Sequence, residues 1–220
     1  MRRAVSFILM IMLLAACAPA NIPPGATGSV GRPSNGVLVD GVQLQPSDEL
    51  IVLDPDHAWG DKTLVDLLHM AALEMRKTYP DTVPLVVGDL SARDGGPLPP
   101  HQSHQSGRDA DVAMYPLDNE LHRPFLRADE DNLDVEKTWY LIETLLHTGL
   151  VKYILLDWNV QKIIYDEVQI TVPQQTLDEV FQYPRPRGTR KGIIRHAAGH
   201  ANHMHVRIHC PDEDIGCVEE

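Results

Sequence analysis

The 220-residue sequence has no apolar run of the length that an ordinary membrane span requires. Its longest apolar run covers residues 4–16, and two arginines precede it. A short positive start followed by an apolar run of this size is the anatomy of a secretory signal peptide. We therefore expect residues 1–16 to direct export and to be removed.

Basic residues are also scarce. The chain carries 19 lysines and arginines against 31 aspartates and glutamates, which gives a formal net charge of −12. The signal peptide holds two of the basic residues and none of the acidic ones, so the remainder is more acidic still. A body of this charge is a poor partner for nucleic acid or for a bare anionic membrane surface. We expect no nucleic-acid partner.

Cysteine occurs only three times. Cys17 closes a Leu-Ala-Ala-Cys sequence that resembles the bacterial lipobox, which implies cleavage before Cys17 and its lipidation; a chance cysteine near an ordinary cleavage site is the alternative. Cys210 and Cys217 then remain, and an oxidising periplasm favours a disulfide between them over two free thiols. We expect a lipid-anchored periplasmic protein, and the alanine after Cys17 points to the inner face of the outer membrane.

No internal repeat divides the chain. Residues 17–36 are rich in Pro, Gly, Ala, Ser and Asn, so they are expected to form a flexible tether that begins at the lipidated cysteine. Residues 37–220 are numerous enough to bury one hydrophobic core, and they predict one domain.

Hydrophobic periodicity in this domain predicts an α+β fold. Helical spacing of apolar residues predicts helices over 64–79, 135–147 and 159–166. Apolar or β-branched runs predict strands over 37–39, 83–87, 111–115, 152–156 and 204–210. Residues 88–107 and most of 171–200 are expected to be loop. The irregular alternation indicates helices that flank a small sheet.

Histidines crowd the last predicted strand. Alternate residues of a strand share a face, so this strand has a polar face and an apolar face. The polar face comprises His203, His205, Arg207 and His209, and the apolar face comprises Met204, Val206, Ile208 and Cys210. The apolar face must pack on the core, so the polar face points into a cleft or to solvent. The His-x-His spacing alone fits a solvated face as well as a site. We expect His196 and His209 to be surface residues.

A second polar group lies upstream. His104 sits in a loop where Gly107 permits a sharp turn, and Asp111 begins a predicted strand. Both side chains can converge with a histidine of another strand, and two imidazoles with one carboxylate leave a fourth position for water, as in a catalytic zinc site. Alternatively, His104 caps a turn and Asp111 forms a surface ion pair. The chain lacks a His-Glu-x-x-His motif, so no motif glutamate is available as the base.

Five stretches of the sequence occur in an order and spacing that resemble a known family. They are Ser29–Gly36, Gly88–Ser91 with Gly95-Gly96, His101–Gly107, Asp109–Asp111, and His200–Arg207 with Cys210-Pro211. This set is similar to the penicillin-insensitive murein endopeptidases, among the zinc peptidases that share the lysostaphin, D-Ala-D-Ala peptidase and hedgehog fold. The resemblance implies an α+β fold with a small central antiparallel sheet and flanking helices, Zn²⁺ as cofactor, and peptidoglycan as partner.

The resemblance also implies roles for individual residues. His104, Asp111 and His205 match the zinc ligands, and His203 and His200 match active-site histidines beside the metal. Zinc would activate a water molecule, and His203 would be the general base or stabilise the oxyanion, with His200 in the complementary role. The implied substrate is the D-alanyl–meso-diaminopimelyl cross-link. A D-Ala-D-Ala carboxypeptidase, or a non-catalytic lipoprotein that binds zinc or peptidoglycan, is the alternative.

Neighbouring positions have several possible roles. His101 is an accessory histidine near the metal or a loop residue in solvent, and Asp109 is expected to hydrogen-bond the turn or a ligand imidazole. Arg207 pairs with a substrate carboxylate or with a local acid. The chain departs from the family pattern at Val37, where members with several disulfides carry a cysteine, and at Arg108, which is expected to alter the rim of the cleft.

Overall fold

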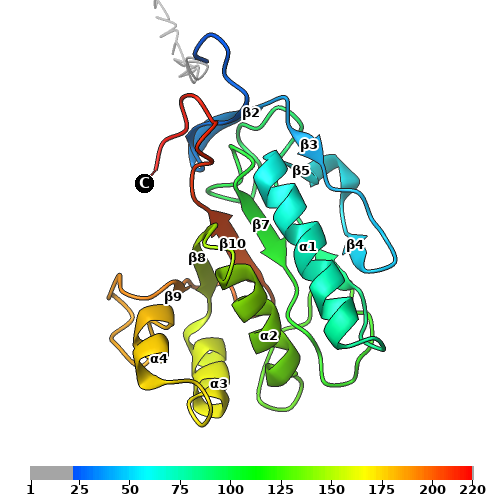
Figure 1. The fold of residues 1–220 in the computed structure, drawn as a ribbon, viewed down its shortest axis with the longest axis vertical. Coiled ribbons are helices and arrows are strands. Elements are labelled where there is room, and N and C mark those ends of the chain that lie inside the picture. The colour runs from blue at the N-terminus through cyan, green and yellow to red at the C-terminus, as the bar shows by residue number, and fades with distance from the viewer. Residues whose placement is uncertain (1–21, 220) are drawn as a thin grey trace, which may run out of the picture.

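The computed structural model describes residues 22–219, which form a sheet with helices packed against it (Figure 1). This arrangement confirms the predicted α+β class. The predicted signal peptide and Cys17 lie outside the described residues. Between residues 22 and 219, no helix has both the length and the apolar character needed to cross a membrane.

Six strands form the main sheet, in the order β4-β6-β7-β10-β8-β9. They are β4 Leu50–Val52, β6 Leu85–Val87, β7 Asp109–Val112, β8 Val151–Leu156, β9 Ile194–His196 and β10 Met204–Ile208. The central pairs are antiparallel, as the resemblance implied, whereas both edge pairs, β4 with β6 and β8 with β9, are parallel. The sheet is therefore mixed overall, and β10 lies at its centre between β7 and β8.

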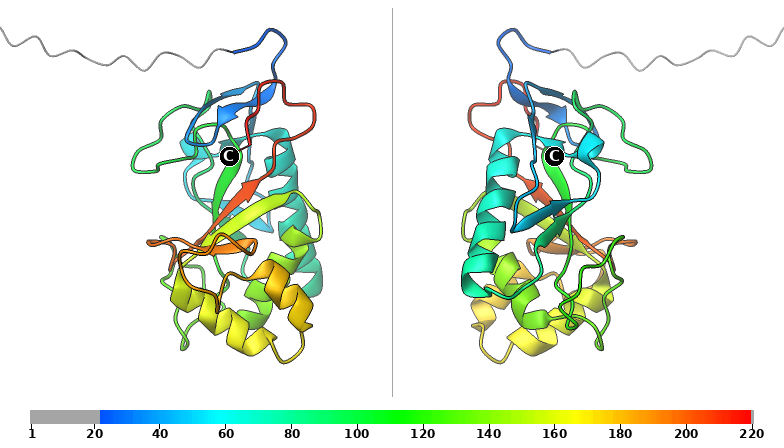
Figure 2. Two further views of the ribbon diagram at one scale, coloured as in Figure 1. Left: turned by 90° about the vertical axis from the view of Figure 1, so that its left-hand side faces the viewer. Right: turned by 90° about the vertical axis from the view of Figure 1, so that its right-hand side faces the viewer.

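Helices cover one face of this sheet. They are α1 Lys62–Thr78, α2 Val135–Leu146, α3 Trp158–Val168 and α4 Gln174–Val180. The first three begin after Asp61, Asp134 and Asp157, each of which accepts a hydrogen bond from a backbone N–H of the first turn. Seen from the side, α1 lies on one side of the sheet and the loop before β7 projects on the other (Figure 2). The predicted helices are thus confirmed, and one face of the sheet is left to loops.

Strand alternation assigns different residues to the two faces. The apolar residues of the two central strands are fully buried in the core with the helices: Ala110, Val112, Met204, Val206 and Ile208. Asp109 and Asp111 of β7, with His205 and Arg207 of β10, occupy the opposite face. These polar side chains are also buried, so this face is the floor of a cleft and is not a solvated surface.

The prediction that residues 17–36 form a flexible tether is wrong for their second half. Strands β1 Gly28–Arg32 and β2 Asn35–Val39 form an antiparallel hairpin there. The hairpin is held by the C-terminal loop, because Gly31 N donates to Gly216 O at 2.8 Å. The composition was misleading because Gly28 and Gly31, with φ of 68° and 79°, belong to the ordered strand β1 and not to a flexible chain.

The loop prediction for residues 171–200 is also partly wrong, because α4 and β9 lie within it. Helix α4 is short and lacks a side-chain N-cap, which explains why its sequence signal is weak. Strand β7 begins and ends earlier than the predicted 111–115. A further two-stranded sheet, β3 Val42–Gln43 with β5 Trp59–Gly60, flanks the short helix η1 Pro55–His57.

The predicted disulfide between Cys210 and Cys217 is present. It closes the C-terminal loop, beside which Arg108 is fully buried. The Nη2 atom of Arg108 donates to Val218 O at 2.9 Å, and its Nη1 atom lies 3.8 Å from Glu219 Oε1. The expectation that Arg108 alters the rim of the cleft is therefore wrong, because its side chain points to the C-terminal segment.

Glu219 gives this segment a pH-dependent contact. Burial raises the pKa of its carboxyl, but the ion pair with Lys152 and the hydrogen bond from Cys210 N outweigh burial and lower the pKa to about 2. A carboxyl whose pKa is lower in the folded than in the unfolded protein stabilises the fold at pH values above its unfolded pKa. This stabilisation is lost as pH falls through the folded pKa. We expect Glu219→Gln to lower the urea midpoint at pH 7, and the difference from the wild type to shrink as pH falls toward 2. Equal midpoints at pH 7 would contradict this.

Candidate active site

The floor of the cleft brings three predicted site residues into contact. Asp111 of β7 lies directly opposite His205 of β10 in the antiparallel register. His104, from the loop before β7, places its Nε2 atom 3.1 Å from His205 Nδ1 and 3.3 Å from Asp111 Oδ1. The Nδ1 atom of His205 is 3.4 Å from the same oxygen. The expected convergence of a loop histidine, a strand aspartate and a second-strand histidine is therefore present.

Backbone geometry fixes the position of His104. Its φ of 64° lies in the left-handed region, which residues other than glycine rarely occupy. The strained conformation is held by two hydrogen bonds: His104 N donates to Asp109 Oδ2 at 2.9 Å, and Nδ1 lies 2.8 Å from Leu90 O. Because Nδ1 donates to that carbonyl, the Nε2 atom of the neutral ring carries the lone pair that faces Asp111.

Asp109 is the fully buried carboxylate that joins these elements. Its Oδ1 atom lies 3.0 Å from His205 Nε2 and accepts from Arg207 Nε at 2.5 Å, while Oδ2 accepts from Arg207 Nη2 at 3.0 Å. Burial would raise the pKa of Asp109, but the charges of His205 and Arg207 hold it well below its usual value. Asp109 thus bonds both the turn and an imidazole, and Arg207 pairs with this local acid.

The three converging atoms fit a metal site. The Oδ1 atom of Asp111 is buried and accepts no hydrogen bond from any residue between 22 and 219. In the neutral form of His205, with Nε2 donating to Asp109, the Nδ1 lone pair faces that oxygen, as does Nε2 of His104. Ligand atoms about 2.1 Å from a tetrahedral zinc lie roughly 3.4 Å apart, close to the separations found. A cation held there would satisfy this buried oxygen, which accepts no hydrogen bond in the described part of the chain.

The same carboxylates act on His205. Burial lowers the pKa of this imidazole, but Asp109 and Asp111 raise it more strongly, to about 9. Burial raises the pKa of Asp111, but the imidazoles of His104 and His205 lower it more strongly, so that it lies far below its usual value. The site therefore attracts positive charge, whether a proton or a metal ion.

His203 and His200 border the three converging side chains. The Nε2 atom of His203 lies 3.5 Å from Asp111 Oδ1, its Nδ1 atom lies 2.8 Å from Asn202 Oδ1, and its ring stacks on Phe125 at 5.4 Å. Burial lowers its pKa to about 4, so the ring is neutral at pH 7. The ring of His200 is 5.0 Å from that of His203, and burial also lowers its pKa.

A cleft of about 650 Å³ opens above these residues. One wall is the loop 100–104, and the other is the segment 197–200 that follows β9. His203, His205 and Arg207 also line it, so the histidines that border the converging atoms face a space large enough for a peptide.

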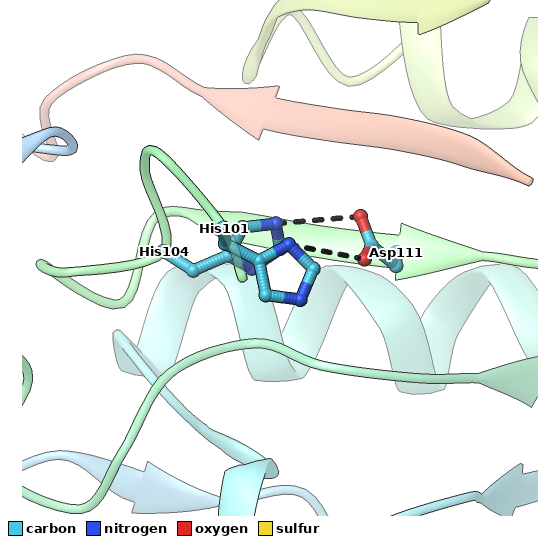
Figure 3. A group of neighbouring side chains, drawn as sticks. All are labelled: His101, His104 and Asp111. Atoms are coloured by element: carbon cyan, nitrogen blue, oxygen red, sulfur yellow. Dashed lines mark ion pairs between the residues drawn. The ribbon is translucent and has the colours of Figure 1, made fainter. Parts of the chain in front are cut away.

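The remaining predicted residues fall into two groups. His101 joins the site, because its Nδ1 atom is 3.8 Å from Asp111 Oδ2 and its ring is 4.3 Å from that of His104 (Figure 3). His196 packs against Trp158, and His209 is exposed beside Glu219, so neither belongs to the site.

Two contacts were missed by sequence reasoning. Phe125, which stacks on His203, lies in a loop that carries no motif. Asp89, which bonds His101 at 2.8 Å, lies in the Gly88–Ser91 stretch. That stretch contributes to the family resemblance, and its acidic residue was the available signal.

The sequence is similar to several named proteins over most of its length. A protein from Pectobacterium atrosepticum named penicillin-insensitive murein endopeptidase is 28% identical over 89% of this chain and 69% of its own length. Relatives of the same name from Yersinia enterocolitica and Escherichia coli K12 are 25% and 26% identical, over 89% and 90% of this chain and 71% and 72% of their own lengths. The sequence model of the penicillin-insensitive murein endopeptidase family matches residues 29–220, and the chain belongs to this family.

Proposed function

We propose that this chain is a zinc peptidase that hydrolyses the D-alanyl–meso-diaminopimelyl cross-links of peptidoglycan. Membership of the murein endopeptidase family supports a metallopeptidase that acts on the wall. The observation that carries the proposal is the convergence of His104 Nε2, Asp111 Oδ1 and His205 Nδ1 within 3.1 to 3.4 Å of one another at the floor of the cleft.

His104, Asp111 and His205 would hold the zinc ion. Two imidazole nitrogens and one carboxylate oxygen make three protein ligands, the number that a catalytic zinc site takes. When bound, zinc lowers the pKa of a water molecule toward about 7 and polarises the scissile carbonyl. His101 stands beside this set as an accessory ligand or as an orienting neighbour.

The side chains of His203 and His200 supply the proton chemistry. With Nδ1 of His203 donating to Asn202 Oδ1, its Nε2 carries the lone pair and faces the site. A neutral imidazole placed in this way accepts a proton from attacking water, so we assign His203 as the general base. His200 borders the same cleft and would stabilise the oxyanion or orient the substrate.

We also propose that Cys17 anchors the protein by a lipid on the periplasmic side, at the inner face of the outer membrane. The support is the sequence alone, since Leu-Ala-Ala-Cys17 follows an apolar leader. Metabolic labelling with a radioactive fatty acid should mark the wild type but not Cys17→Ser, and the variant should leave the membrane fraction. Equal labelling of both proteins would remove Cys17 as the anchor.

Turnover of defined wall fragments tests the substrate. We expect the purified chain to convert cross-linked muropeptide dimers to monomers, and a zinc chelator to stop the reaction because the metal activates the water. The products are followed by chromatography and mass spectrometry. Release of D-alanine from monomers without cleavage of dimers would favour a carboxypeptidase instead, and zinc binding without any turnover would favour a non-catalytic binding protein.

Two alanine variants separate metal binding from proton transfer. His205→Ala should lose stoichiometric zinc, measured by elemental analysis after dialysis, because it removes one ligand and one hydrogen-bond partner of Asp109. His203→Ala should keep zinc and lose about 10²–10⁴-fold in kcat, since it removes the general base. Full zinc content in His205→Ala would refute the ligand assignment, and an active His203→Ala protein would remove His203 from the mechanism.

A further inference from the structure

Asp89 follows strand β6 and lies between two histidines. Its Oδ2 atom is 2.8 Å from Nε2 of His101, and its Oδ1 atom is 3.1 Å from Nδ1 of His57, at the end of η1. The three side chains are only partly buried. Both oxygens of the carboxylate are therefore held by imidazole N–H groups, and this fixes the plane of the carboxylate.

The second nitrogen of His101 faces the metal site. Because Nε2–H donates to Asp89, Nδ1 of the neutral ring carries a lone pair. That atom is directed at Asp111 Oδ2 across 3.8 Å, and Figure 3 shows His101 and His104 both turned toward Asp111. Two acceptors that face one another at this separation make no hydrogen bond, so the pair is suited to a cation or a proton-bearing group between them.

We propose that Asp89 and His57 are positioning residues that hold His101 with Nδ1 turned toward the metal site. The arrangement is a carboxylate–histidine pair of the kind that fixes the tautomer and raises the basicity of an imidazole at a metal centre. His57 acts one step further out, because its N–H fixes the Asp89 oxygen that His101 does not use. This inference rests on the proposed function, since it needs a metal at Asp111.

One competing arrangement uses the same residues. Asp54 Oδ2 lies 3.4 Å from Nδ1 of His57, so Asp54, His57 and Asp89 could bind a separate cation. Asp89 is already engaged by both imidazoles, which favours a hydrogen-bonded relay over a second site. The two arrangements differ in what Asp54 contributes, because Asp54 contacts His57 and has no contact with His101 in the described chain.

The test measures metal affinity instead of activity. The zinc affinity of the purified chain is measured by competition with a chromophoric chelator. The metal environment is followed by the visible absorption spectrum of the cobalt-substituted protein. Asp89→Asn should weaken zinc binding about 10–100-fold and shift the cobalt bands, because the imidazole loses its anionic partner. His57→Ala should weaken zinc binding less, and His57→Asn, whose amide replaces the N–H donor, should restore it.

Asp54→Asn is the matched control. It removes the same charge from the same cluster, it retains an oxygen that can accept from Asp56 N, and it should leave zinc affinity and the cobalt spectrum unchanged. Thermal unfolding of the metal-free proteins should also be unchanged, which excludes a general loss of structure. If Asp89→Asn does not fold, the comparison of His57→Ala with His57→Asn carries the test.

The proposal would be overturned if Asp89→Asn kept the zinc affinity and the cobalt spectrum of the wild type. If Asp89→Asn does not fold, the same result in His57→Ala would overturn it. It would equally be overturned if the wild type bound two cations and Asp54→Asn lost one, because that result makes the cluster a separate site. Failure of the proposed function gives a different pattern. In that case the wild type binds one metal ion, does not cleave muropeptide dimers, and still differs from Asp89→Asn in affinity.

Discussion

The buried carboxylate of Asp109 is the constraint on which the rest of the site depends. It accepts two hydrogen bonds from Arg207, one from Nε2 of His205 and one from the backbone N–H of His104. A buried charge is tolerated only when it is paired and hydrogen-bonded, and these contacts meet that requirement. Because these partners come from the loop before β7 and from β10, one side chain of β7 fixes the relative positions of two proposed metal ligands.

The sheet determines where such a site can form. Helices pack on one face, so the apolar residues of β7 and β10 are committed to the core. The alternate residues must then lie on the other face, which the loop before β7 and the segment after β9 wall in. The antiparallel register sets Asp111 opposite His205 without any special local geometry. Only His104 needs an unusual backbone conformation to reach them.

Local pattern was sufficient for part of this architecture. Strand alternation placed Asp111 and His205 on faces opposite to the apolar residues, and helical spacing located α1 to α3, because both periodicities are set by backbone geometry. It was insufficient where distant segments decide the outcome. The partners of Asp109 and Asp89 come from elsewhere in the chain, and Arg108 is buried by a C-terminal segment that follows it by about a hundred residues. The sequence predicted a linker where β1 and β2 form a hairpin, because glycine frequency does not distinguish a flexible chain from an ordered strand with glycines at positive φ.

The hairpin of β1 and β2 is hydrogen-bonded to the C-terminal loop, and its position in the chain limits how far the domain can lie from Cys17. Strand β1 begins at Gly28, so only about ten residues separate it from Cys17, and a chain of that length spans at most about 35 Å. Lipid attachment at Cys17 would therefore confine the cleft to a thin layer above the membrane. Tension on the anchor would pass first into β1 and the loop closed by Cys210 and Cys217, at a distance from the strands that carry the histidines.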